Sequence, residues 1–149
     1  MQLLIELIIT FFAIISFGVI FSVPKRALLI GGSIGMVTWG VLQFGLTFAA
    51  STVFATALAS LTAATIAHLL AKKIKIPVTT LAIPGILPLV PGSRAYFTML
   101  SFVEGNYIQG LEFGVETMLQ AGAIAAGLVF ALSIFSLGKG IGHRYEPNH

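Results

Sequence analysis

Five apolar stretches dominate the sequence, and each is long enough to cross a lipid bilayer. They span residues 3–23, 27–47, 50–71, 78–103 and 116–137. About 20 apolar residues in a helix cross the hydrocarbon core, and a helix in lipid bonds all of its own backbone groups. The sequence therefore predicts an all-α, polytopic membrane protein with five transmembrane helices, forming a single integral membrane domain over residues 1–149.

The charge content supports this prediction and narrows the chemistry. Only 9% of the residues are charged, whereas a soluble domain carries about 25%. The chain has no cysteine and no aspartate, which excludes disulfides, cysteine–zinc sites and thiol nucleophiles. The histidines (His68, His143 and His149) lack the spacing of metal ligands, and the sequence contains no HExxH motif and no phosphate loop. We therefore expect no enzyme activity, no catalytic residues, no metal and no cofactor.

The basic residues gather in the segments that follow alternate apolar stretches. Seven of the eight are Lys25, Arg26, Lys72, Lys73, Lys75, Lys139 and Arg144. Short loops rich in Lys and Arg stay on the cytoplasmic side of a membrane. Five crossings with the N-terminus outside and the C-terminus in the cytoplasm place all seven on that side. We therefore interpret these residues as loop anchors and expect no nucleic-acid partner.

The fourth apolar stretch contains the segment "IPGILPLVPGSRAYF", residues 83–97, which disfavours a continuous helix. It carries three prolines and two Pro-Gly pairs, made up of Pro84, Gly85, Pro88, Pro91 and Gly92. A proline removes a backbone N–H and clashes with the carbonyl four residues earlier, and glycine adopts conformations that other residues avoid. We predict a short helix at about 77–83, an unwound stretch at 84–91 and a second helix from Gly92–Ser93.

The start of this second helix has the properties of an anion site. Unwound backbone at membrane depth must be buried in protein or line a cavity. With Ser93 as N-cap, the helix would direct free N–H groups and its positive dipole end toward mid-membrane, where Arg94 adds a full charge. This combination suits a carboxylate or phosphate, and transporters use broken helices to hold substrates. The alternative is a simple kink, with Arg94 reaching to an interface or to lipid phosphate.

Other polar side chains within the spans have two interpretations each. Thr56 and Ser60 lie on one stripe of the third span, next to a stripe of alanines (Ala55, Ala59, Ala63 and Ala67). Small residues at this spacing let helices approach closely, and hydroxyl groups bond across the contact. The two hydroxyl residues either serve this packing or line a path for the substrate, and Gln120 in the fifth span can also face the bundle.

Three titratable residues are candidates for proton coupling. They are Glu6 in the first span, Glu116 at the start of the fifth, and His68 near the end of the third. An ionisable residue within a span is by default a functional hypothesis. The alternative is a solvated position near the membrane interface for each of them.

Two segments resemble a known family. "SFGVIFSVPKRAL" and "IPGILPLVPGSRAY" resemble the threonine/serine exporter family, and more narrowly its small-subunit, or C-terminal-half, membrane domain. The resemblance covers nearly the whole chain. It implies export of threonine and serine, or of succinate in a split pair, across the bacterial inner membrane. It also implies motif positions at Pro84, Gly85, Pro88, Pro91, Gly92 and Tyr96, with Arg94 outside them, and a longer membrane subunit of the same family as partner.

An odd number of crossings fits the idea of half a transporter. Two five-span halves joined in sequence have opposite orientations, as in inverted-repeat transporters that bind substrate between the halves. We therefore expect a bilayer-embedded exporter subunit for a small carboxylate substrate. The alternatives are a non-transporting scaffold or assembly subunit, and a homo-oligomeric channel.

Overall fold

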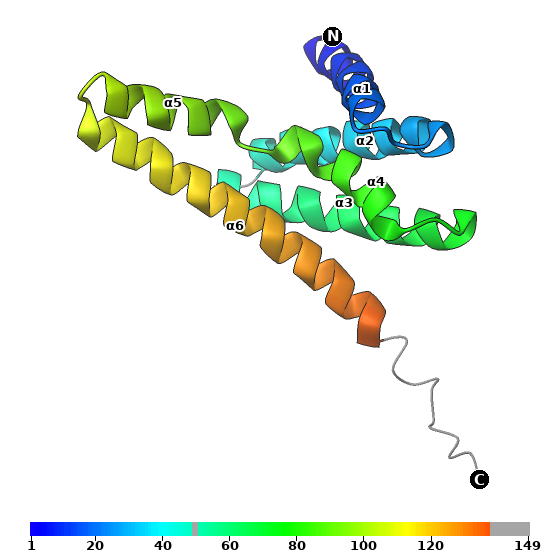
Figure 1. Cartoon of the computed structure of the whole chain (residues 1–149). Helices are drawn as coiled ribbons and strands as arrows, with labels where there is room; N and C mark the ends of the chain where they lie inside the picture. Colours follow the sequence, from blue (N-terminus) through cyan, green and yellow to red (C-terminus); the bar gives the residue numbers. More distant parts are fainter. Residues whose placement is uncertain (49–50, 138–149) are drawn as a thin grey trace.

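A computed structural model describes residues 1–48 and 51–137, and within these ranges every regular element is a helix (Figure 1). The elements are α1 (Gln2–Ile20), α2 (Lys25–Phe48), α3 (Thr52–Ile74), α4 (Val78–Ile86), the 3-10 helix η1 (Leu87–Leu89), α5 (Gly92–Val103) and α6 (Tyr107–Leu137). Four of these, α1, α2, α3 and α6, are long and apolar enough to cross a membrane, and the bent pair of α4–η1 with α5 makes a fifth crossing when counted as one span. The structure confirms the all-α, polytopic class.

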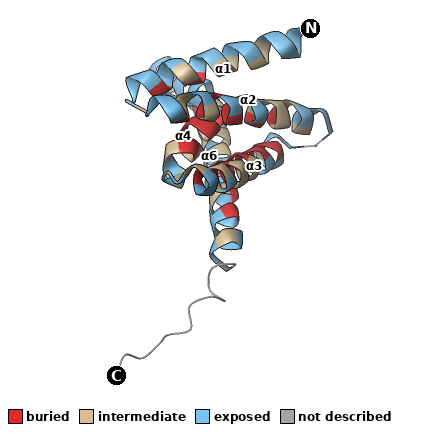
Figure 2. Ribbon diagram, turned by 90° about the vertical axis from the view of Figure 1, so that its right-hand side faces the viewer, coloured by how far each residue is buried: buried red, intermediate tan, exposed pale blue. Residues whose placement is uncertain are grey.

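The core of the bundle lies between α2, α3, α4 and the second half of α6. Figure 2 shows the buried residues concentrated on these helices, whereas α1 is largely exposed. The alanine stripe of α3 is buried as predicted, because Ala55, Ala59, Ala63 and Ala67 are each 0% exposed. Methyl side chains let three neighbouring helices approach α3 closely, which explains why this helix occupies the centre.

The two ends of the bundle differ in charge. Ala27, which follows Arg26, packs in one cluster with Ala67 and Ala71, which precede Lys72. The residues Lys25, Arg26, Lys72, Lys73 and Lys75 therefore lie at one end, which we call the basic end. The opposite end holds Glu6 in α1 and the turn after α5, which begins at Glu104. Lys139 and Arg144 lie outside the described residues.

The break in the fourth span is shorter than predicted. Helix α4 continues through Pro84 and Gly85 to Ile86, so residues 84–86 are helical rather than unwound. Pro84 is tolerated because its ring packs against α2, where an added Cβ on Gly31 would lie 2.9 Å from Pro84 Cβ. Pro88 lies in the first turn of η1, where backbone N–H groups have no acceptor within the helix, so the missing N–H of proline costs no hydrogen bond. The chain is extended at Val90, and the axes on either side of the break differ by 53°.

Helix α6 begins earlier than predicted. The fifth apolar stretch predicts a start at residue 116, but only the turn 104–106 separates α5 from α6, with Gly105 at φ +81°. Residues 107–116 are helical because they pair with α5, and an added Cβ on Gly110 would lie 3.2 Å from the ring of Phe102. Figure 1 shows α5 and the first half of α6 extending side by side. The remaining spans agree with their predicted bounds to within a few residues.

Candidate functional site

The first half of the Pro-Gly segment is a packing contact. Pro84 and Gly85 are both buried. An added Cβ on Gly35 would lie 3.3 Å from the carbonyl oxygen of Pro84, and one on Gly85 would lie 2.7 Å from Ile34 Cγ2. These two members of the predicted substrate site therefore touch α2. This contact holds the end of α4 against α2, just before the break.

The break lies away from the centre of the bundle. An added Cβ on Gly85 would be 3.7 Å from Ala63 Cβ, and Ala63 is the middle residue of α3. Leu89 is buried with Ala55 and Ala59, which belong to the first two turns of α3. Helix α5 therefore begins toward the end opposite the basic end, not at mid-depth as expected. The reason is that α4 stays helical past the centre.

The first turn of α5 leaves part of its backbone unbonded. The Gly92 N–H donates to the Val90 carbonyl at 2.8 Å, and the Ala95 N–H donates to the Pro91 carbonyl at 3.0 Å. Within residues 1–48 and 51–137, the N–H groups of Ser93 and Arg94 have no backbone acceptor. The Gly92 N–H is therefore not one of the free donors of this turn. Ser93 is not the N-cap, because the chain enters the helix at Pro91.

This turn faces open space. Residues 92–97 are all exposed, and an added Cβ on Gly92 would meet no atom within 4 Å. Tyr96 is 63% exposed and contacts the neighbouring Phe97 ring edge-on, with centroids 5.6 Å apart. Helix α5 packs chiefly on α6. The predicted site residues from Gly92 to Tyr96 thus lie on a surface that the other described residues, 1–48 and 51–137, leave exposed.

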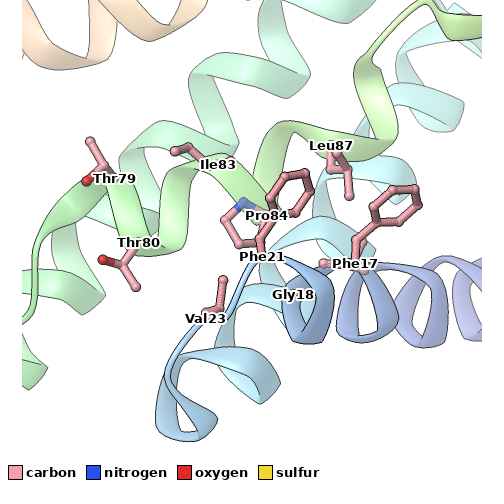
Figure 3. A pocket seen from close by; sticks show the side chains of 10 residues that line it. Phe17, Gly18, Phe21, Val23, Thr79, Thr80, Ile83, Pro84 and Leu87 are labelled. Atoms are coloured by element: carbon pink, nitrogen blue, oxygen red, sulfur yellow. The ribbon is translucent and has the colours of Figure 1, made fainter.

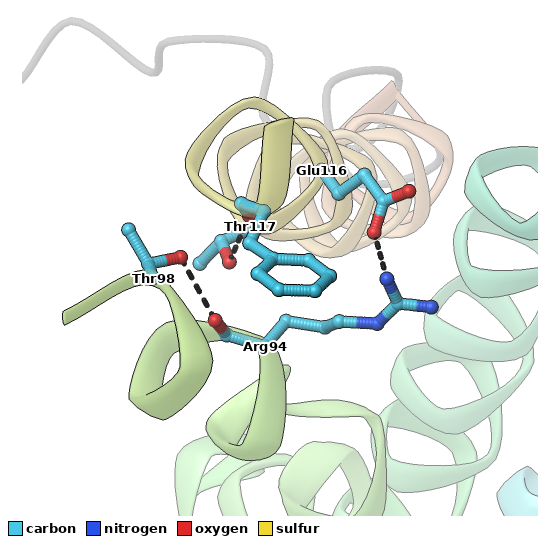
Figure 4. Close-up of polar contacts among 5 residues, drawn as sticks. Arg94, Thr98, Glu116 and Thr117 are labelled. Atoms are coloured by element: carbon cyan, nitrogen blue, oxygen red, sulfur yellow. Dashed lines mark hydrogen bonds and ion pairs between the residues drawn. The ribbon is translucent and has the colours of Figure 1, made fainter. Parts of the chain in front are cut away.

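Arg94 forms an ion pair with Glu116 across the α5–α6 hairpin (Figure 4). Its Nη1 donates to Glu116 Oε2, and its Cζ lies 5.7 Å from the centroid of the Phe113 ring. The Thr98 hydroxyl donates to the Arg94 carbonyl at 2.8 Å. The two charged side chains are 44% and 43% exposed. Both residues stand out in the sequence, but their pairing depends on the turn at 104–106, which the sequence did not predict.

Glu6 is held by donors from α2. Trp39 Nε1 and Gln43 Nε2 both donate to Glu6 Oε2, at 3.3 Å and 3.0 Å. The three side chains are half-buried, and Glu6 and Gln43 border a hollow of about 390 Å³ that also includes Thr47. Glu6 was predicted to lie in the first span, but its partners on α2 were not predicted. The sequence did contain one indication, because Trp39 and Gln43 are four residues apart and therefore share one face of their helix.

The remaining candidates lie on α3 and α6. Thr56 and Ser60 are 3% and 0% exposed, and Ser60 Oγ lies 2.9 Å from the Ala57 carbonyl and 3.4 Å from the Ala123 carbonyl. This arrangement favours the packing interpretation over a path. His68 stacks on Phe135, with centroids 4.2 Å apart. Gln120 is half-buried on α6, one turn beyond Glu116.

A cavity that the sequence did not predict lies between α1 and α4. Its volume is about 260 Å³, and its lining includes Phe17, Phe21, Pro84 and Leu87 (Figure 3). The side chains of Thr79 and Thr80 supply the only hydroxyl groups of this lining. Such a lining suits an apolar group better than a carboxylate. Within the described part of the chain, no three His, Asp or Glu side chains come close enough to hold a metal ion.

Comparison with known proteins agrees with the resemblance noted in the sequence. No curated protein and no solved structure matches the chain significantly. A family model described as "Threonine/Serine exporter, ThrE" matches residues 6–134, which includes the broken span and both members of the ion pair. The chain belongs to the threonine/serine exporter family.

Proposed function

We propose that this chain is a membrane subunit of an exporter that moves threonine and serine across the bacterial inner membrane. The observation that carries the proposal is the break between η1 and α5, with Arg94 in the first turn of α5 and open space around Gly92. The substrate carboxylate would bind the N–H groups of Ser93 and Arg94 and the Arg94 guanidinium. Charge-assisted hydrogen bonds of this kind are among the strongest available in proteins.

A second membrane subunit would complete the site. Arg94 and Glu116 lie in apolar spans yet are nearly half exposed in this chain, and lipid is a costly environment for such groups. A longer subunit of the same family, in the opposite orientation, would cover this surface and form the second wall of the substrate path. The N-terminus would then lie outside and the C-terminus in the cytoplasm, with the basic end facing the cytoplasm.

Three rival readings share the same fold. The chain can serve a small dicarboxylate such as succinate, act as a scaffold without transport, or form a homo-oligomeric channel. The burial of Pro84 and Gly85 in helix packing supports a shaping role for that half of the motif. It does not account for the charged pair at the start of α5. Glu6, Glu116 and His68 belong to the proposal as candidates for coupling transport to a proton.

The test is export from cells that lack and then regain this chain. The gene is deleted in its native host, where any partner remains present, and is restored on a plasmid. Export of labelled threonine, serine and succinate is then measured. The proposal predicts that deletion abolishes export of the amino acids and that the plasmid restores it. Unchanged threonine and serine export in the deletion strain would contradict it, and loss of succinate export alone would favour the dicarboxylate reading.

A further inference from the structure

The ion pair between Arg94 and Glu116 has unused bonding capacity. A guanidinium carries five N–H donors and a carboxylate has two acceptor oxygens. The pair uses Nη1 of Arg94 and Oε2 of Glu116. Among the described residues, the other guanidinium nitrogens and Glu116 Oε1 have no hydrogen-bond partner. The two side chains are 44% and 43% exposed, so a ligand can reach a positive and a negative group at one place.

A purely structural role explains this pair poorly. The hairpin is already held by the Phe102 ring against Gly110, by Thr98 against Gly114, and by the Phe97 and Phe113 rings with centroids 6.0 Å apart. Exposed ion pairs contribute little to stability. Two charges in a membrane span are costly, and apolar residues of similar volume are often at least as stabilising. The pair therefore contributes little to the stability of the α5–α6 hairpin.

We infer that Glu116 binds the ammonium group of the substrate while Arg94 binds its carboxylate, so that the pair selects α-amino acids over dicarboxylates. In an α-amino acid the two charged groups are attached to one carbon atom, so a matching site needs opposite charges side by side. Arg94 and Glu116 provide this arrangement. Without substrate, Glu116 occupies the place of the substrate carboxylate on Arg94. This inference rests on the proposed function.

The surroundings orient the two groups for this role. The Phe113 ring lies under the Arg94 guanidinium, which favours one position of the cation. The Thr98 hydroxyl bonds the Arg94 carbonyl and not its side chain, so the guanidinium donors stay available. A dicarboxylate would bring a second negative charge toward Glu116, and like charges at close range repel each other.

The test uses threonine counterflow, which needs no knowledge of a coupling ion. Inverted membrane vesicles from the complemented deletion strain are loaded with unlabelled threonine, and entry of labelled threonine is followed. Loss of a charge-assisted bond predicts that Glu116→Gln reduces threonine counterflow about 10- to 100-fold. The same variant is expected to raise succinate entry relative to threonine. Glu112→Gln, which changes an exposed carboxylate one turn earlier on α6, is the matched control and should transport normally.

A charge swap distinguishes substrate binding by the pair from a purely structural role in holding α5 and α6 together. The double variant Arg94→Glu/Glu116→Arg keeps an ion pair between α5 and α6 but reverses its orientation against the substrate and the helix dipole. We expect it to reach the membrane at normal levels and to lose threonine counterflow. Wild-type counterflow in this variant would overturn the inference, because any ion pair would then suffice.

Competition on the unmodified protein decides the question even if the swap does not fold. N-acetylthreonine lacks the ammonium group and threonine amide lacks the carboxylate. Both should compete with threonine at least about tenfold more weakly than serine does. Equal competition by N-acetylthreonine would overturn the role of Glu116 while leaving threonine transport intact. Vesicles with the wild-type chain that show no more counterflow than deletion vesicles would instead refute the proposed function itself.

Discussion

Gly127 in α6 offers a sharp test of how α3 and α6 pack. An added Cβ there would lie 2.7 Å from the Ala57 carbonyl oxygen and 2.8 Å from the Leu61 N, and it would also overlap Ser60 Oγ. The first two are backbone atoms of α3, which cannot turn away as a side chain can. Gly127→Ala must therefore push the two helices apart. Gly122, on the same helix, has no atom within 4 Å of an added Cβ and supplies a matched control.

The expected cost follows from the difference between the two variants. Each gains the same helix propensity from Gly to Ala, so that contribution cancels. Inserting a methyl group into a close-packed contact costs about 1–3 kcal/mol. We expect Gly127→Ala to unfold more easily than Gly122→Ala by that amount. Unfolding with increasing SDS in mixed micelles, followed by the fluorescence of the single tryptophan, measures the difference. Equal free energies of unfolding for the two variants would refute the close α3–α6 contact.

Three further changes test other parts of the account. Gly92→Ala should not lower the free energy of unfolding, because the added methyl group meets nothing within 4 Å. It should nevertheless slow threonine counterflow at least about tenfold, and normal counterflow would remove the first turn of α5 from the site. Gly31→Ala should lower the free energy of unfolding by about 1–3 kcal/mol, because the methyl group meets the Pro84 ring. Gly40→Ala should cost little, because an added Cβ there lies 3.7 Å from Leu7 Cδ2. The same SDS titration compares the two variants. Glu6→Ala leaves the Trp39 and Gln43 donors without their acceptor and should destabilise the chain by about 1–3 kcal/mol. Glu112→Ala is the exposed control. An equally small effect of both variants would contradict the contact of Glu6 with α2.

The first three spans could be predicted from sequence because bilayer thickness sets the length of an apolar helix that crosses it. The alanine stripe of α3 also follows from local spacing. The extent of the break could not be predicted, because Pro84 stays helical through its contact with Gly31, which is far away in the sequence. The prolines predict the segment in which the helix breaks, but the packing against α2 determines where in that segment α4 ends.

The residues of the candidate site stand out in the sequence, whereas their arrangement in space does not. Arg94 and Glu116 were both singled out, but their pairing depends on the register of the α5–α6 hairpin. That register follows from residues 107–116 being helical, although they precede the apolar stretch that predicts the fifth span. The contact of Glu6 with Trp39 and Gln43 likewise depends on how α1 crosses α2. Local patterns identify chemically unusual residues, whereas non-local packing determines which of them meet.

The most direct test of the central claim is substrate protection at the start of α5. The chain has no cysteine, so Ser93→Cys introduces the only thiol of this chain, and Glu104→Cys places one in the hairpin turn as a control. Labelling by a membrane-impermeant maleimide is timed in right-side-out vesicles, which expose the end opposite the basic end. The rates are compared with and without saturating threonine, using a Ser93→Cys variant that retains counterflow. The account predicts that threonine slows labelling at position 93 several-fold and leaves position 104 unchanged. Equal labelling rates at position 93 with and without threonine would contradict it.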